Sequence, residues 1–201
     1  MKDSFITLPP PQTAGPLSME EAIVQRRSVR EYRPEALTLA EVGQLLWAAQ
    51  GITRQGDYRS APSAGATYPL EVLLAAGNVD DLDPGSYRYH FREHALAPLL
   101  EGDLRKQLAA AALDQSCVKD GAAALVITAI YERTTGKYGQ RGRRYVHMEV
   151  GYASENIHLQ AAALGLGTVA VGAFHDDRIQ ELLNLSPNEH PLLIMPVGKP
   201  Y

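Results

Sequence analysis

The sequence predicts an α+β fold, and three observations support this class. Two segments have the capping signals and apolar spacing of amphipathic helices, and several short apolar segments have the character of strands. The two kinds of element do not alternate strictly along the chain, as they would in a doubly wound parallel sheet. The 201 residues, 45% hydrophobic and 21% charged, suit one soluble domain with its own core.

The first sixteen residues are expected to form an extended N-terminal arm, because they are rich in proline and lack periodicity. Residues 17–201 are expected to form a single domain, since no repeat or linker follows the arm. No signal peptide is recognisable, and no apolar run approaches the roughly 20 residues of a membrane span. We therefore expect a cytoplasmic protein, although an export signal removed ahead of the arm stays open.

Two capping boxes predict where the first helices begin. Ser18 with Glu21, and then Thr38 with Glu41, have the spacing in which each side chain satisfies a backbone N–H group of the other residue. Apolar residues follow both boxes at helical spacing. Gly51 is expected to end the second helix in the left-handed conformation.

The remaining elements are predicted from apolar runs and from glycine and proline breaks. The first half supplies a turn-rich loop over 57–69, a strand from 70, a hairpin-like strand over 87–91 and a helix from 102. The second half supplies a central strand over 122–132, a basic loop over 133–144, a long helix over 145–164, a short strand over 168–174, a helix from 176 and a last strand over 191–198. Within the first loop, Ser63 could begin a short helical turn.

A cluster of cations follows the first helix. Arg26 and Arg30 lie four residues apart, so a continued helix would place both on one side, with the Ser28 hydroxyl between them. Arginine binds phosphate oxygens bidentately, so this cluster is suited to phosphate. Solvated cations at a helix end would give the same pattern. We favour the phosphate site over solvated cations because Arg26 falls on the apolar stripe of the helix. A buried charge needs a partner, and the sequence offers only Glu31 or a distant acid.

Four motifs occur in a fixed order: RRSVREY from residue 26, PSAGATYP from 62, GLGTVAVGAF from 165 and VGKP from 197. Together they resemble the nitroreductase family of FMN-dependent oxidoreductases. The loop KYGQRGRRY and the interval between WAAQGIT and PSAGATYP are closer to the branch that includes the dehydrogenases of azolines, which form thiazoles and oxazoles in peptides. The resemblance implies a three-layer fold with a mainly antiparallel central sheet flanked by helices.

The resemblance also implies an FMN site at the interface of a homodimer. The phosphate and ribityl chain would be held by Arg26, Arg27, Ser28, Arg30 and Lys199. The ring bound mainly by the partner subunit would be lined by Pro62, Ser63, Ala64 and Gly65. The backbone close to the ring would be that of Gly165, Gly167, Gly172 and Ala173. Several cations suit a phosphate dianion, and small residues leave room for a flat ring, although GLG alone would also be an ordinary helix end.

Two further pairs of residues have possible chemical roles. Lys137 and Tyr138 match a pair implicated in proton removal in the azoline-oxidising relatives; the plainer interpretation is a solvated basic loop, and the loop could also attract NAD(P)H phosphates. Glu155 and His158 have the spacing of a di-iron half-site, with Glu149 as a further candidate. Because no second copy of this motif exists, we expect no metal.

Composition limits the partners. The net charge of -4 argues against nucleic-acid binding. Cys117 is the only cysteine, which excludes an internal disulfide and predicts a buried or half-buried thiol.

Two functions are compatible with these features. The first is an FMN-dependent oxidoreductase that passes a hydride through flavin N5, from NAD(P)H to a small acceptor such as a nitroaromatic or a quinone, or that dehydrogenates a small substrate. The second is a module that binds or sequesters flavin without NAD(P)H-driven turnover. The chain departs from the family in two ways. It stops at Tyr201, where other members continue into a tail that embraces the partner, and its length leaves little room for a large-peptide recognition domain.

Overall fold

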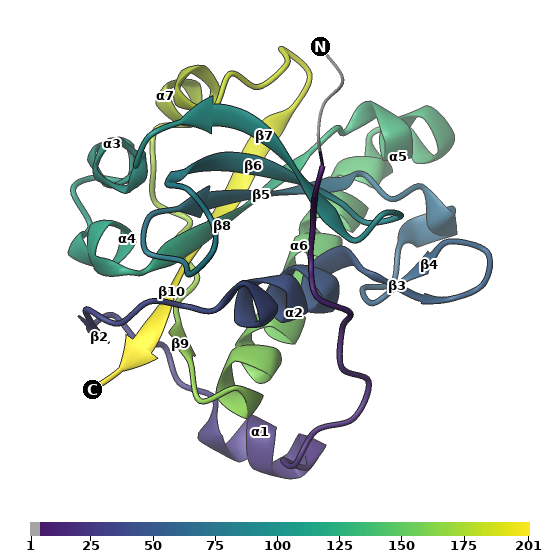
Figure 1. The fold of residues 1–201 in the computed structure, drawn as a ribbon. Helices are drawn as coiled ribbons and strands as arrows, with labels where there is room; N and C mark the ends of the chain where they lie inside the picture. Colours follow the sequence, from purple (N-terminus) through teal and green to yellow (C-terminus); the bar gives the residue numbers. More distant parts are fainter. Residues whose placement is uncertain (1–4) are drawn as a thin grey trace.

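The computed structural model describes residues 5–201 and contains one large sheet with helices on both faces (Figure 1). The strands are hydrogen-bonded in the order β1-β7-β6-β5-β8-β10-β2, and β9 pairs with β10 beside this path. Their bounds are, in chain order, β1 Ile6–Thr7, β2 Tyr32–Arg33, β5 Leu70–Ala76, β6 Gly85–His90, β7 Ala95–Glu101, β8 Ala123–Ala129, β9 Gly167–Thr168 and β10 His190–Pro200. Each of these pairings is antiparallel, which confirms the predicted sheet.

Two hydrophobic cores lie on opposite faces of the sheet, which gives the expected three layers (Figure 1). One core contains α2 (Leu39–Gln50) and α6 (Arg141–Ala163), and the other contains α3 (Arg105–Ala111), α4 (Ser116–Asp120) and α7 (Asp176–Leu182). The helices α1 (Met19–Gln25) and α5 (Glu132–Tyr138) pack against α6. A small hairpin of β3 (Ile52–Arg54) and β4 (Tyr58–Arg59) and the 3-10 turn η1 (Ala64–Ala66) lie between α2 and β5.

The strand β8 is central, as predicted from its unbroken apolar sequence. It pairs with β5 on one side and β10 on the other, and all of its residues are buried. Leu125 belongs to the core beneath α2 and α6, whereas Val126 belongs to the core beneath α3, α4 and α7. A strand covered on both faces has no need of polar alternation.

Residues 6–8 of the expected arm pack along the sheet, and the chain then passes beside α2. Leu8 is buried, and its N–H group donates to the carbonyl of His94 at 3.1 Å. Gln12 and Gln44 exchange two hydrogen bonds of 2.8 and 3.0 Å. The pairing of β1 with β7 covers an edge of the sheet that would otherwise present unpaired backbone groups. The first four residues of the arm lie outside the described part of the chain.

Both predicted capping boxes are present, at Ser18 with Glu21 and at Thr38 with Glu41. The expected left-handed end of α2 is wrong. Gly51 is extended (φ −70°, ψ 156°), because the chain passes directly from the helix into β3.

The basic loop predicted over 133–144 is also wrong. The segment forms α5 and the first turn of α6, with a break at Gly139 (φ 55°, ψ −148°). Tertiary contacts fix the helix: Thr134 is buried, and Arg133 Nη1 lies 2.6 Å from a carboxylate oxygen of Glu71 in β5. The long helix therefore begins at Arg141 rather than at Tyr145.

Smaller differences concern short elements. The strand expected over 168–174 is reduced to β9 and one bridge between Val171 and Ile194. The helix α7 is preceded by His175, which makes no side-chain cap, while Asp176 lies in its first turn. Cys117 is buried, as expected, in the unpredicted helix α4. None of the helices described within residues 5–201 is both long and apolar enough to cross a bilayer.

Candidate functional site

The cationic segment of residues 26–30 is extended, so the prediction that it continues α1 is wrong. The helix ends at Gln25, and Arg26 has non-helical dihedrals (φ −51°, ψ 123°). Ser28 forms a parallel bridge with Thr168, and the N–H group of Val29 donates to the Thr168 carbonyl at 2.9 Å. Pairing with β9 thus supplies backbone hydrogen bonds that another helical turn would have supplied.

An extended backbone can still group three of the four phosphate ligands that the resemblance places in this segment. Successive side chains of an extended segment point to opposite sides. Arg26, Ser28 and Arg30 are therefore expected on one side, and Arg27 and Val29, which line a common pocket, lie on the other. Arg26 and Arg30 would share a side in either conformation. The reason here is the alternation of an extended backbone, not the four-residue spacing of a helix.

Arg27 and Val29 have structural roles on their side of the segment. Arg27 Nη1 donates to the carbonyls of Val24 at 2.6 Å and Arg26 at 2.8 Å, and so satisfies acceptors at the end of α1. Val29 packs on Gly167, where an added Cβ would lie 2.6 Å from Val29 Cγ1. The structure therefore separates Arg27 and Gly167 from the other predicted cofactor residues.

Arg26 does not occupy a buried position. Its side chain is 34% exposed, and the apolar stripe before it is open as well, with Met19 61% and Ile23 57% exposed. Its Nε atom lies 4.0 Å from Oε1 of Glu155 in α6, a partner that the sequence argument did not identify. An ion pair this long and exposed contributes little stability, so the guanidinium remains available to a ligand.

Lys199 lies in β10 and does not join these arginines in the structure. Its Nζ atom contacts Oε1 of Glu41 at 3.2 Å. The other oxygen of Glu41 accepts from the N–H group of Thr38 at 2.7 Å in the capping box of α2. The role of Lys199 toward a phosphate stays a prediction.

The turn Pro62–Gly65 is held by a buried carboxylate of α6. Ser63 precedes the 3-10 turn, as expected, and its hydroxyl donates to Oε1 of Glu149 at 3.1 Å. The N–H group of Ala64 donates to the same oxygen at 2.8 Å. Glu149 is only 3% exposed, and burial raises the pKa of its carboxyl above the ordinary value despite these two donors.

The pair Lys137 and Tyr138 meets this turn at Gly65. Lys137 Nζ donates to the Gly65 carbonyl at 3.3 Å. A Cβ atom added at Gly65, whose φ of +59° already favours glycine, would lie 2.5 Å from both Lys137 Nζ and Tyr138 Oη. The structure therefore brings the Lys137–Tyr138 pair next to the turn Pro62–Gly65, although the two segments are more than seventy residues apart in the chain.

The glycine-rich segment divides into two parts. Gly165 ends α6 with φ +68°, which is the ordinary helix-end role of such a residue. Gly172 and Ala173 are exposed, and a Cβ at Gly172 would meet no atom within 4 Å. Gln115, which the sequence argument missed, donates from Nε2 to the Ala173 carbonyl at 3.0 Å and fixes this exposed backbone.

The residues of the suspected half-site for di-iron make separate contacts. Glu149 holds the turn, and Glu155 faces Arg26. His158 is 7% exposed, its Nδ1 has no hydrogen-bond partner within residues 5–201, and burial lowers the pKa of its imidazole. Glu149 could have been recognised as unusual, because it lies beside Val150 on the buried face of the helix.

Over residues 23–199 the sequence matches the nitroreductase family. The chain therefore belongs to the nitroreductase family, and by class it is a flavin-dependent oxidoreductase.

Individual relatives confirm the family and the fold. A protein of Methanocaldococcus jannaschii, provisionally named a nitroreductase, is 46% identical over 183 residues, or 91% of each chain. The microcin B17-processing protein McbC of Escherichia coli is 30% identical over 171 residues, which are 81% of this chain and 62% of McbC. The crystal structure of a provisionally named nitroreductase from Ralstonia eutropha has a TM-score of 0.85 at 29% identity, covering 98% of this chain and 90% of that one.

We predict that the substitution Glu149→Gln removes the free-energy cost of burying the Glu149 carboxylate charge, which grows as the pH rises. The amide oxygen can accept both hydrogen bonds, while the buried charge is lost. Because the pKa of Glu149 is raised, the folded protein binds this proton more tightly than the unfolded chain does. The contribution of the Glu149 carboxyl to the stability of the wild type is therefore complete below the ordinary pKa of 4.5. It is lost as the pH rises through the pKa of this group in the folded state.

The free energy of unfolding of Glu149→Gln minus that of the wild type should thus increase across this window and then level off. Urea denaturation between about pH 4 and about pH 8 measures the difference. Glu181→Gln, at an exposed position of α7, is the matched control and should not reproduce the trend. A difference that falls with pH would contradict the assignment.

Proposed function

We propose that the protein binds FMN and transfers hydride between NAD(P)H and a small acceptor, or dehydrogenates a small substrate. The observation that carries the proposal is the extended backbone of residues 26–30, on which the alternate side chains of Arg26, Ser28 and Arg30 are expected on one side. Two guanidinium groups and a hydroxyl complement a phosphate dianion. The open backbone at Gly172 suits the approach of a flat ring. Membership of the nitroreductase family supports the same cofactor class.

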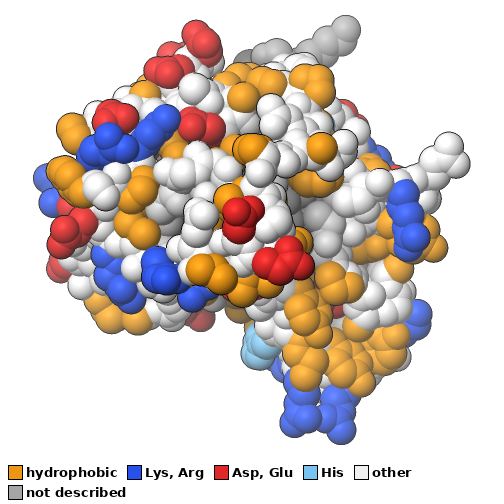
Figure 2. Space-filling model, turned by 90° about the horizontal axis from the view of Figure 1, so that it is seen from below, with side chains coloured by type: hydrophobic (Ala, Val, Ile, Leu, Met, Phe, Trp, Pro, Cys, Tyr) orange, Lys and Arg blue, Asp and Glu red, His pale blue; other side chains and the backbone are white. Residues whose placement is uncertain are grey.

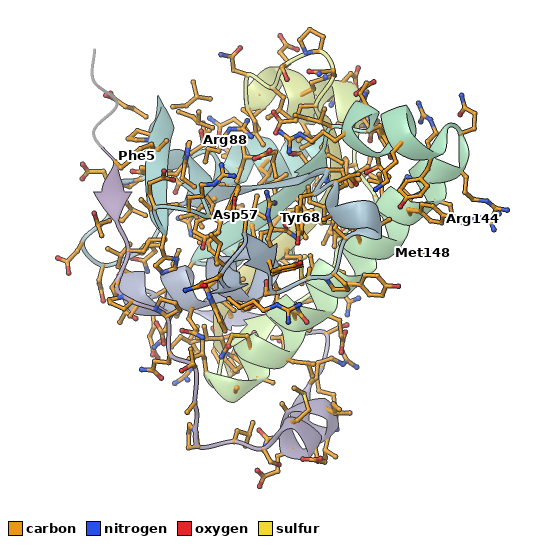
Figure 3. All side chains as sticks on the ribbon, turned by 90° about the vertical axis from the view of Figure 1, so that its right-hand side faces the viewer. Phe5, Asp57, Tyr68, Arg88, Arg144 and Met148 are labelled. Atoms are coloured by element: carbon orange, nitrogen blue, oxygen red, sulfur yellow. The ribbon has the colours of Figure 1, made fainter. Side chains whose placement is uncertain are left out.

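The proposed site is shared between two subunits of a homodimer. Glu149 holds the turn Pro62–Gly65, and Glu155 contacts Arg26 six residues later, about 9 Å along α6. On the same stretch of α6, Met148 and Tyr152 are 47% and 48% exposed, and Figure 3 shows Met148 projecting outward from the helix. A partner packed on this face would bring its own turn toward the cationic segment.

The underside of the molecule also suits association. The helix α1 lies at this end (Figure 1) and exposes Met19, Ile23 and Val24, the last to 68%. Figure 2 shows hydrophobic side chains gathered beside Lys and Arg on this face. Large exposed apolar side chains on neighbouring helices are typical of an interaction surface.

When bound, FMN would supply hydride transfer at its N5 atom. Arg26 and Arg30 would neutralise the phosphate, and Gly172 and Ala173 would offer backbone close to the ring. In the dehydrogenating direction, Tyr138 would act as a base in its phenolate form, with Oη accepting the substrate proton to become the phenol and the ammonium group of Lys137 beside it. The relation to McbC, a protein named for processing microcin B17, supports keeping this second direction.

We predict that Arg26→Ala weakens FMN binding roughly 10- to 100-fold, the effect of losing a charge-assisted hydrogen bond. Arg27→Ala is the matched control, because Arg27 lies on the other side of the segment and should leave binding unchanged. Flavin absorbance per protein after dialysis measures retention, and circular dichroism checks the fold. Equal retention in both variants would exclude Arg26 as the anchor, and unfolding of Arg26→Ala would make it structural.

We predict that the purified protein is yellow and that NADH or NADPH bleaches it without oxygen. A small acceptor added afterwards should restore the colour. A yellow protein that neither donor bleaches would favour the flavin-sequestering alternative. A colourless protein that cannot be reconstituted with FMN would contradict both functions.

We predict that the wild type sediments with twice the mass of one chain and that Tyr152→Glu sediments with the mass of one chain. A buried carboxylate without a partner opposes association. Leu99→Glu, at a 39% exposed position of β7, is the control and should stay dimeric. A wild type that sediments as a single chain would contradict the shared site.

A further inference from the structure

A pocket of about 600 Å³ lies between the β3–β4 hairpin and the turn Pro62–Gly65. Its lining includes the side chains of Arg54, Tyr58, Arg59 and Tyr68. Figure 3 looks onto this side of the molecule, where Tyr68 lies near the hairpin. The pocket adjoins the turn that we propose faces the flavin, so it is placed to receive the second reactant.

The pocket contains a half-buried cation without a counter-ion. The guanidinium of Arg59 lies 4.5 Å from the ring centre of Tyr68 and 3.8 Å from that of Phe91. Its Nη1 donates to the neutral side chain of Gln50 at 2.8 Å and to the Leu70 carbonyl at 3.4 Å, and its Nε has no partner among the described residues. No carboxylate within residues 5–201 forms an ion pair with it. Burial lowers the pKa of Arg59, which reflects the cost of keeping this charge out of water.

Two more cations border the same space. Arg54 lies 4.3 Å from the ring centre of Tyr58, is exposed, and forms no ion pair among the described residues. Lys137 reaches the pocket rim at Gly65, where its ammonium group donates to the Gly65 carbonyl and lies 5.6 Å from the ring centre of Tyr138, without an ion pair among the described residues. The pocket is thus electropositive in a protein whose net charge is -4. A cleft lined by one sign of charge concentrates ligands of the opposite sign.

The nearby carboxylates of the described residues form no ion pair with these cations, although the charge of Glu71 raises the pKa of Arg59 and so opposes the effect of burial. Asp57 of the hairpin is paired with Arg92, and Glu71 is paired with Arg133 at 2.6 Å. Glu149, behind the turn, already accepts two hydrogen bonds. Burial raises the pKa of the Glu149 carboxyl, while its two hydrogen-bond donors and the charge of Arg59 act in the opposite direction. Among residues 5–201, no carboxylate residue lines the pocket.

We propose that this pocket binds the carboxylate of a small aromatic reactant and so gives the enzyme a preference for anionic substrates. The inference rests on the proposed function in one respect, the orientation of the turn toward the flavin. The unpaired cations supply the charge that a carboxylate needs. The rings of Tyr58 and Tyr68 supply a surface for the aromatic part of the same molecule. A pocket with both cations and aromatic rings suits an aromatic carboxylate better than a bare phosphate, which has no apolar part to pack on the rings.

Isothermal titration calorimetry with para-nitrobenzoate and its neutral amide, para-nitrobenzamide, tests the proposal on the protein as purified. The two probes have the same shape and differ in charge. We expect the wild type to bind the acid at least about tenfold more tightly, the effect of one charge-assisted hydrogen bond. The preference should weaken as salt is added.

Two variants locate the effect. Arg54→Gln should reduce the preference, and Arg59→Met should abolish it. Arg178→Gln removes an exposed arginine of α7 and is the matched control that should keep it. If Arg59→Met fails to fold by circular dichroism, the response of Arg54→Gln decides the question.

Equal binding of the two probes, no binding of either, or a preference unchanged in Arg54→Gln would overturn the proposal. Displacement of the acid by pyrophosphate at equal concentration would also overturn it, because a bare phosphate site would then explain the charge. Binding is measured without turnover, and flavin content is recorded in each sample. A protein that prefers the acid but is not bleached by NAD(P)H would therefore retain the pocket and lose the proposed function.

Discussion

The carboxylate of Glu149 is the contact on which the candidate site depends. One oxygen accepts hydrogen bonds from the Ser63 hydroxyl and the Ala64 N–H group, and so fixes the turn to the middle of α6. Without this acceptor two donors would lose their partner, at a cost of about 1–3 kcal/mol for each one left buried. The same turn offers the space at Gly65 toward which Lys137 and Tyr138 converge.

The helix α6 connects this turn to the cationic segment. Its buried stripe, with Val146, Val150 and Ile157, anchors it in one of the two cores. Glu149, on this buried side, holds the turn, and the exposed Glu155 contacts Arg26. The spacing of the turn and the cationic segment is therefore set by a rigid helix, which keeps such groups in register.

Cations that look equivalent in the sequence have different surroundings in the fold. Arg27, Arg133 and Lys199 are occupied by a helix end, by Glu71 and by Glu41. Arg54 and Arg59 have aromatic neighbours but no counter-ion within residues 5–201. A cation held close to a carboxylate is partly screened by it, whereas a cation without a counter-ion keeps more of its attraction for an anion.

The sequence by itself determined the elements whose signals are local: the two capping boxes, the apolar strand β8, most of α6 and the order of the family motifs. The predictions that failed depended on partners distant in the chain. Residues 26–30 are extended because they pair with Thr168, and residues 132–138 are helical because α5 packs on α6 and Arg133 meets Glu71. Only the tertiary structure could assign Glu149 to the turn and leave Arg59 without a counter-ion, since hydrogen bonds and ion pairs between distant segments leave no periodic trace in a sequence.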